Sequence, residues 1–189
     1  MRFLTTTATS GTPDPATLCL SVASTEEEVR EVQRLRYKVF IESMGLSALE
    51  NRDGLDRDEF DLCCDHLIVR DTRSLKVVGT YRVMSPQAAR RMGQYYSEKE
   101  FDLSRLDNLR SRIAEAGRAC IHPDYRSGGV IMLLWAGLAA FMKKENWLTA
   151  ISCGIMYGLT SLSNTAAFMV PSIFIFFMYN SFFCFMSPV

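Results

Sequence analysis

The chain has 189 residues, with 21 Lys and Arg against 21 Asp and Glu, so its formal net charge is zero. A chain of this length can bury one hydrophobic core, and we expect one main folded domain. Balanced charge excludes a general attraction to nucleic acid or to acidic membranes, so any basic binding site must be local.

The predicted elements alternate between strands and helices. Residues 1–16 are rich in Thr, Ser and Pro, and we expect them to be disordered. A strand follows at 18–24, and Thr25 with Glu28 forms a capping box that opens a helix ending at Gly45. An acidic loop covers 49–61. Runs at 64–71 and 76–84 flank a turn signal and predict an antiparallel hairpin.

The second half continues the alternation. Residues 86–93 predict a short helix, and 95–109 are irregular or partly helical. A central strand is expected at 112–121, a helix at 128–145, and a further strand or strands within 148–162. This order predicts an α/β fold with a mixed central sheet flanked by helices, spanning residues 17–162.

The end of the chain has an atypical composition. The last charged residue is Glu145, and residues 146–189 contain no Asp, Glu, Lys, Arg or His. Residues 163–189 form an apolar tail whose uncharged run 166–186 is long enough to cross a bilayer. Three interpretations stay open: a membrane anchor, a buried C-terminal element, or an aberrant end such as a shifted reading frame produces.

Six cysteines show no CxxC pair and no histidine at metal-ligand spacing. They indicate reduced thiols and predict no metal site. Cys63 and Cys64 lie in a run that resembles a strand. No apolar signal-peptide region follows the N-terminus, so we expect a cytoplasmic protein, peripheral to or anchored at the inner membrane if the tail is an anchor.

The segment "RSGGVI", residues 126–131, lies between the predicted central strand and the helix that follows. Glycines let the backbone approach phosphate oxygens, a helix start leaves N–H groups free, and an arginine adds a charge-assisted hydrogen bond. The segment therefore predicts a phosphate-binding turn, and the alternative is an ordinary glycine-rich connection. Its residues are Arg126, Ser127, Gly128 and Gly129.

A spaced set of charged residues accompanies this turn. It consists of an R-x-x-x-F motif, a D-x-D-x-x-D motif, one arginine on the hairpin and an E-x-x-R motif on the central strand: Arg36, Phe40, Asp56, Asp58, Asp61, Arg82, Glu115 and Arg118. Arginines on strands are costly to bury unless they are paired. We predict a network in which the aspartates brace the arginines, the alternative being solvated surface charges.

These motifs carry a resemblance to a known family. The segment "RSGGVI" resembles the R/Q-x-x-G-x-G/A signature of the GCN5-related N-acyltransferases, with Ile131 in place of its final small residue. The blocks "RLRYKVF", "DRDEFDLCCDHLIV", "VVGTYRVM", "YYSEKEFDL" and "EAGRACIHPDYRSGGVIMLLWAGLAAF" together resemble ornithine–acyl carrier protein N-acyltransferases over residues 22–142. Acyl-homoserine lactone synthases share several of these motifs but usually place a Trp soon after the Phe of R-x-x-x-F, and residues 41–46 contain none.

The resemblance implies a function. It implies transfer of a 3-hydroxyacyl chain from acyl carrier protein to the α-amine of L-ornithine, the first step of ornithine lipid synthesis in bacteria. The donor's 4′-phosphopantetheine would lie on the turn, and no separate cofactor is expected. Acyl carrier protein is acidic and needs a local basic surface. The alternatives are an acyl-homoserine lactone synthase-like enzyme and a truncated or inactive member that only binds acyl carrier protein.

Roles follow for four residues of the predicted central strand. Glu115 is the candidate general base for the attacking amine. Arg118, three positions on, should lower the pKa of Glu115, and a purely structural Glu115–arginine pair is the alternative. Backbone N–H groups near Cys120 and Ile121 are the candidate oxyanion donors, by analogy with the family. No covalent intermediate is required, so the Cys120 thiol need not be a nucleophile.

Overall fold

A computed structural model describes residues 17–43, 53–147 and 149–151. The predictions for the N-terminal residues 1–16, for the helix end at Gly45, for the first part of the acidic loop and for the apolar tail lie outside the described residues. The same holds for Cys153 and Cys184. Among the described residues, no helix is both long and apolar enough to cross a membrane.

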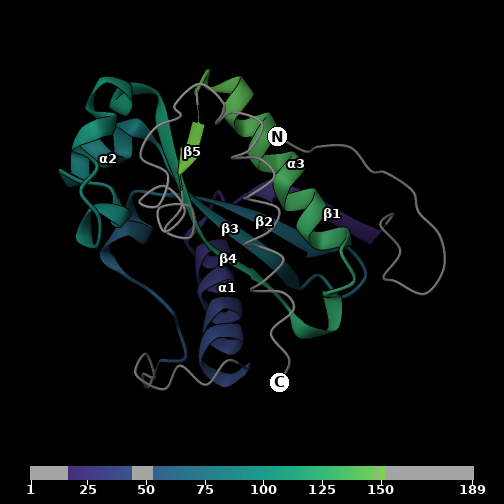
Figure 1. Cartoon of the computed structure of the whole chain (residues 1–189). Helices are drawn as coiled ribbons and strands as arrows, with labels where there is room; N and C mark the ends of the chain where they lie inside the picture. The colour runs from purple at the N-terminus through teal and green to yellow at the C-terminus, as the bar shows by residue number, and fades with distance from the viewer. Residues whose placement is uncertain (1–16, 44–52, 148, 152–189) are drawn as a thin grey trace.

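Five strands form one mixed sheet (Figure 1). They are β1 (Leu18–Val22), β2 (Asp65–Asp71), β3 (Val77–Met84), β4 (Ile113–Ile121) and β5 (Thr149–Ile151), and they lie in sequence order across the sheet. The pairs β1–β2, β2–β3 and β3–β4 are antiparallel, whereas β4 and β5 are parallel. The mixed sheet, the hairpin and the interior position of β4 are confirmed, although β3 is the middle strand of the five.

Two helices cover the two faces of this sheet. Because successive side chains of a strand point to opposite faces, Ile68 of β2 packs with Val32 and Leu35 of α1 (Glu26–Tyr37). The neighbouring β2 residues Leu67 and Val69 pack instead with α3 (Gly129–Lys144). Strand β2 is therefore buried on both faces, which explains its continuous apolar run.

The first helix begins as predicted at Thr25. Its hydroxyl accepts a hydrogen bond from the backbone N–H of Glu28 at 3.2 Å, which is one half of the expected capping box. The other half differs, because the Glu28 carboxylate accepts from the N–H of Ser24 at 2.8 Å. Helix α1 then continues as a π-helical segment, Lys38–Ser43, which carries Phe40.

A third apolar cluster is formed mainly by the segment of chain that connects β3 to β4. It contains α2 (Pro86–Met92) and the 3₁₀ segments Tyr96–Lys99 and Ser104–Arg112, in the region predicted to be irregular or partly helical. The buried Tyr95 closes this cluster by donating its hydroxyl hydrogen bond to the carbonyl of Ile113 at 2.8 Å. This connection fixes the loop after α2 against the beginning of β4.

The strand-like interpretation of the two adjacent cysteines is wrong. Cys63 ends the 3₁₀ turn Glu59–Leu62, and β2 starts only at Asp65. The N–H groups of Cys63 and Cys64 both bond to the carbonyl of Phe60, so the turn geometry keeps this pair out of the ladder. The cysteines of the described chain, Cys19, Cys63, Cys64 and Cys120, are free thiols.

Candidate active site

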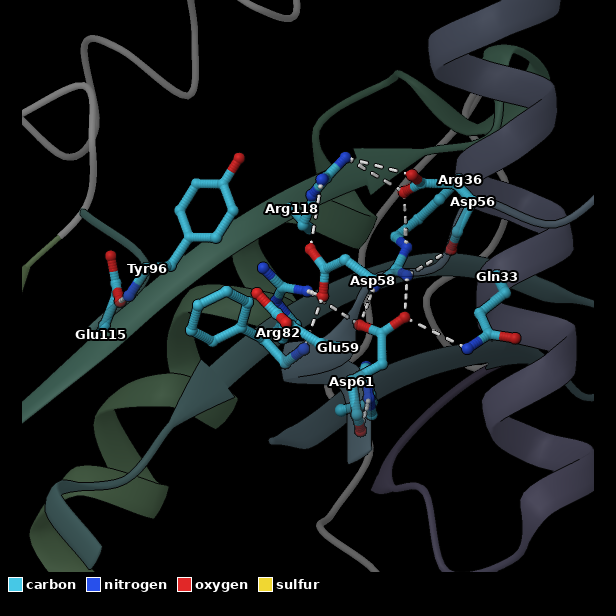
Figure 2. A network of polar contacts seen from close by, with 12 residues as sticks. Gln33, Arg36, Asp56, Asp58, Glu59, Asp61, Arg82, Tyr96, Glu115 and Arg118 are labelled. Atoms are coloured by element: carbon cyan, nitrogen blue, oxygen red, sulfur yellow. Dashed lines mark hydrogen bonds and ion pairs between the residues drawn. The ribbon is translucent and has the colours of Figure 1, made fainter. Parts of the chain in front are cut away.

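The predicted charge network is present, with Asp61 at its centre (Figure 2). Its carboxylate lies 2.5 Å from Nη2 of Arg36 and 2.9 Å from Nη1 of Arg82. Gln33 of α1 adds a hydrogen bond from its amide nitrogen to Asp61 at 3.1 Å. One carboxylate thus ties helix α1 to strand β3.

The other two aspartates extend the network to β4. Asp56 lies 2.9 Å from Nε of Arg36 and 3.1 Å from Nη1 of Arg118. Asp58 lies 2.6 Å from Nη1 of Arg82 and 3.3 Å from Nη2 of Arg118. Every aspartate of the D-x-D-x-x-D motif therefore bridges two arginines, which is the arrangement that a buried charge requires.

Burial and the neighbouring charges have opposite effects on the pKa values of Asp61 and Arg82. Burial by itself would raise the pKa of Asp61, but hydrogen bonds and charge from Arg36 and Arg82 outweigh it and lower that pKa to about 2. Burial would likewise lower the pKa of Arg82, and Asp58 and Asp61 instead raise it. Asp61 and Arg82 are therefore both charged at neutral pH.

Arg118 reaches the network through an irregularity in β4. Thr80 pairs with Cys120 while Arg82 pairs with Gly117, so β4 carries one extra residue at this point. Arg118 has a positive φ of 52°, a backbone conformation that costs a residue other than glycine about 1–3 kcal/mol. The bulge turns the Arg118 guanidinium towards Asp56 and Asp58. The alternation of an ordinary strand would not predict this orientation.

Phe40, which was predicted together with Arg36, lies outside the charge network. Its half-buried ring packs against the apolar cluster between α1 and the sheet, beside Val39 and Ile68. The R-x-x-x-F motif therefore combines a network residue with a packing residue one turn further on.

Glu115 is buried, but it is not paired with Arg118. Its Oε1 accepts hydrogen bonds from the N–H and hydroxyl of Ser97, and its Oε2 accepts from the N–H of Tyr96 at 2.6 Å. Burial raises the pKa of Glu115, and the hydrogen bonds from Ser97 and Tyr96 offset this only in part. The expected lowering of this pKa by Arg118 is thus wrong, because the Arg118 guanidinium is engaged by Asp56 and Asp58.

The candidate oxyanion donors point in different directions. The N–H of His122 donates to the carbonyl of Val78 on β3 at 2.9 Å. Successive N–H groups of a strand point to alternate edges, so the Ile121 N–H points away from β3 and the Cys120 N–H towards it. Both side chains are buried in apolar clusters. Only the Ile121 N–H faces the edge of β4 on which β5 lies.

The turn predicted to bind phosphate joins β4 to α3. Gly128 precedes the helix with a positive φ of 100°, and the first helical hydrogen bond runs from Met132 N to Gly128 O at 3.1 Å. The N–H groups that come before this bond are free for an anion. A Cβ built on Gly128 would meet nothing within 4 Å, so the backbone is approachable.

Side chains around the turn divide into two groups. The half-buried Arg126 makes no hydrogen bond or ion pair within the described residues. Tyr125, in contrast, donates its hydroxyl hydrogen bond to Asp71 at 2.6 Å, and His122 lies 3.1 Å from Nζ of Lys38. The turn is therefore anchored to the β2–β3 hairpin while its arginine stays available. No sequence pattern indicated the Tyr125–Asp71 contact, because 54 positions separate its partners.

Two further residues next to the network were also missed. The ring of Tyr96 lies 5.4 Å from the Arg82 guanidinium and meets the Phe60 ring edge to face. His66 on β2 is buried, its Nδ1 has no hydrogen-bond partner among the described residues, and burial lowers its pKa. Tyr96 falls in the "YYSEKEFDL" block, but nothing in that pattern distinguishes it from Tyr95.

The fold and the site define a class. Residues 35–136 match the acetyltransferase (GNAT) domain family, and the chain belongs to that family. The fold is also similar to that of solved acyl-homoserine lactone synthases. A CoA-dependent enzyme, BjaI, with isopentyl-CoA and SAM, is 22% identical, with a TM-score of 0.53 over 67% of this chain and 59% of that one. LasI is 16% identical, with a TM-score of 0.52 over 71% of both chains. The predicted fold class is confirmed.

Within that class, the sequence is similar to L-ornithine Nα-acyltransferases. The enzyme of Rhodobacter capsulatus is 33% identical over 158 residues, which are 80% of this chain and 59% of that protein. The enzyme of Brucella abortus is 36% identical over 149 residues, 72% of this chain and 52% of that protein. The predicted resemblance is confirmed, and the chain spans about half the length of the curated relatives it matches. In the described part, no cluster of His, Cys, Asp or Glu has an arrangement that could hold a metal ion.

Proposed function

We propose that this chain is an N-acyltransferase that moves a 3-hydroxyacyl group from acyl carrier protein to the α-amine of L-ornithine. The product is lyso-ornithine lipid, an intermediate of ornithine lipid synthesis. The observation that carries the proposal is the similarity to four L-ornithine Nα-acyltransferases, 33–36% identical over 72–80% of this chain. Because the product is a lipid, we place the enzyme in the cytoplasm, at the inner membrane during release.

The turn before α3 supplies the donor site in this proposal. The donor carries one phosphodiester at the base of its 4′-phosphopantetheine arm. Free N–H groups at the start of α3 suit that anion, as does the Arg126 guanidinium, which has no partner among the residues that the structure describes. Basic side chains near the turn, Lys38, Lys76 and Arg126, would face the acidic carrier protein.

The reaction needs a proton acceptor and an oxyanion site. The α-ammonium of ornithine must lose a proton before its nitrogen attacks the thioester carbon. Attack forms the C–N bond and a tetrahedral oxyanion, whose collapse breaks the C–S bond. The pantetheine sulfur takes up the second proton that the attacking nitrogen loses and leaves as the thiol. Glu115 is the proposed acceptor, directly or through water, because its raised pKa brings it closer to that task and Oε2 accepts only one hydrogen bond. The Ile121 N–H is the proposed oxyanion donor.

The test uses purified full-length protein, 3-hydroxyacyl carrier protein and labelled L-ornithine. Formation of labelled lyso-ornithine lipid supports the proposal, and S-adenosylmethionine as acceptor tests the lactone synthase alternative in parallel. Donor binding is measured separately by calorimetry. Binding without any product would identify a chain that recognises acyl carrier protein without turnover, and the proposed reaction would then be wrong.

A further inference from the structure

Two side chains meet at the more exposed side of the charge network. The Arg118 guanidinium lies 5.9 Å from the centre of the Tyr96 ring, although Arg118 comes from β4 and Tyr96 from the 3₁₀ segment after α2. Arg118 lies outside the apolar clusters, and Tyr96 packs only at the edge of the cluster that contains Phe60. Both side chains carry a polar group that the described residues leave available, as their contacts show.

Arg118 differs from the other two arginines of the network. Its side chain is 21% exposed, whereas those of Arg36 and Arg82 are 1% and 6% exposed. Its contacts to Asp56 and Asp58, at 3.1–3.3 Å, are longer than the 2.5–2.9 Å ion pairs of Arg36 and Arg82. Its Nε makes no hydrogen bond within the described residues, and it is not buried. Arg118 thus keeps an unused donor that solvent or a ligand can reach.

Tyr96 also has an unused polar group. Its N–H bonds to Glu115 and its half-buried ring packs against Arg82 and Phe60, so the side chain is held in place. Its hydroxyl has no hydrogen-bond partner in the part of the chain that the structure describes. In Figure 2 this hydroxyl points away from Glu115, towards the side of the network on which Arg118 lies.

We propose that Arg118 and Tyr96 form the subsite that binds the carboxylate of the acceptor amino acid. A guanidinium and a phenolic hydroxyl are both donors to a carboxylate, and the guanidinium geometry suits its planar shape. The network itself is neutral, with three arginines and three aspartates, and so carries no excess charge that would repel an anion. The positive φ of Arg118 is a strained conformation of the kind found at ligand sites.

This subsite would also orient the reacting nitrogen. Tyr96 contacts Arg118 through its ring and Glu115 through its N–H, so a carboxylate held by the first pair lies near the proposed base. An α-amino acid, whose carboxylate and ammonium share one carbon, matches this arrangement, whereas a simple amine does not. The inference rests on the proposed function, because it assigns the acceptor site of that reaction.

The experiment compares L-ornithine with L-ornithinamide, in which a neutral amide replaces the carboxylate. Calorimetry gives both dissociation constants for the wild-type protein and for the variants Tyr96→Phe and Arg118→Lys. We expect the wild type to prefer ornithine about tenfold or more, as a hydrogen bond to a charged group implies. Each variant should reduce that preference at least threefold, roughly the share of one hydrogen bond, while ornithinamide binding stays unchanged.

Arg30→Lys, which alters an exposed guanidinium on α1, is the matched control and should keep the full preference. Circular dichroism confirms that each variant is folded. Equal wild-type affinity for the two compounds, binding of neither, or equal weakening of both in the variants would overturn the subsite. Acyl transfer to ornithine with an unchanged preference would remove the subsite and leave the proposed function standing. A preference for the carboxylate compound without any acyl transfer would support the subsite and contradict the proposed function.

Discussion

The charge network and the turn before α3 both contain arginines, but these arginines make opposite kinds of contact. In the network, Arg36 and Arg82 are buried and held by aspartates at 2.5–2.9 Å. In the turn, Arg126 has no partner within the described residues, and the space beside Gly128 is open. A guanidinium whose donors are already satisfied stabilises the fold, whereas one with free donors can bind a ligand. The first region should thus govern stability, and the second donor affinity.

The largest effect is expected from Asp61→Asn. An amide cannot neutralise two buried guanidinium groups, and removing one partner of a buried ion pair costs about 3–5 kcal/mol. Urea denaturation measures the loss. Asp107→Asn, at an exposed pair with Arg110, should change the free energy of unfolding by less than about 1 kcal/mol. Similar losses in the two variants would mean that burial of the network does not matter.

Substitution of the arginine in the turn should change the affinity for the donor and not the stability of the fold. Arg126→Ala is expected to weaken carrier-protein donor binding by about 1.5–3 kcal/mol, the range for a hydrogen bond to a charged group, with an unchanged melting temperature. Arg91→Ala is the exposed-charge control. A lower melting temperature with unchanged donor affinity would mean that residues 126–129 only connect β4 to α3 and do not bind the donor.

The two glycines of the turn should differ from each other. Gly129→Val should weaken donor binding, because a branched side chain obstructs close approach to the backbone. Gly128→Val should in addition lower the melting temperature, because Gly128 and not Gly129 has the positive φ. Calorimetry and thermal unfolding of both variants separate the two effects. Equal melting temperatures would contradict the assignment of the strained position.

Acid should affect the network at an unusually low pH. The pKa of Asp61 in the folded protein is about 2, below its ordinary value of 3.8, so its contribution is complete above pH 3.8 and is lost as the pH falls towards 2. This contribution is about 2 kcal/mol by the conversion of a pKa difference. Carbon-detected NMR titration of the Asp61 carboxyl group checks it directly. Titration at or above 3.8 would show that the arginines do not hold the charge.

The smallest effect should come from Tyr125→Phe, which removes the hydrogen bond between the turn and the end of β2. Loss of the hydrogen bond to Asp71 is expected to weaken donor binding by about 1 kcal/mol through a looser turn. Asp71→Asn keeps an acceptor and should retain most of the affinity. Equal, large losses in both variants would indicate a direct contact of this pair with the donor.

The sequence by itself determined which segments form strands and helices. Apolar periodicity located α1, the β2–β3 hairpin, β4 and α3, because side-chain spacing within one element is a local property. It also identified the charged residues and the turn, since strand arginines demand partners and glycines before a helix permit an anion. The similarity to acyltransferases reinforced both conclusions.

Only the tertiary structure decided how these residues are connected. Glu115 and Arg118 stand three positions apart, yet the first bonds to Ser97 and Tyr96 and the second to Asp56 and Asp58. Residues three positions apart on a regular strand point to opposite faces, and one extra residue in β4 instead turns Arg118 to the face on which Asp56 and Asp58 lie. A bulge redirects a side chain in this way without leaving a periodic signal. Contacts between residues far apart in the sequence depend on register and packing, which no local pattern encodes.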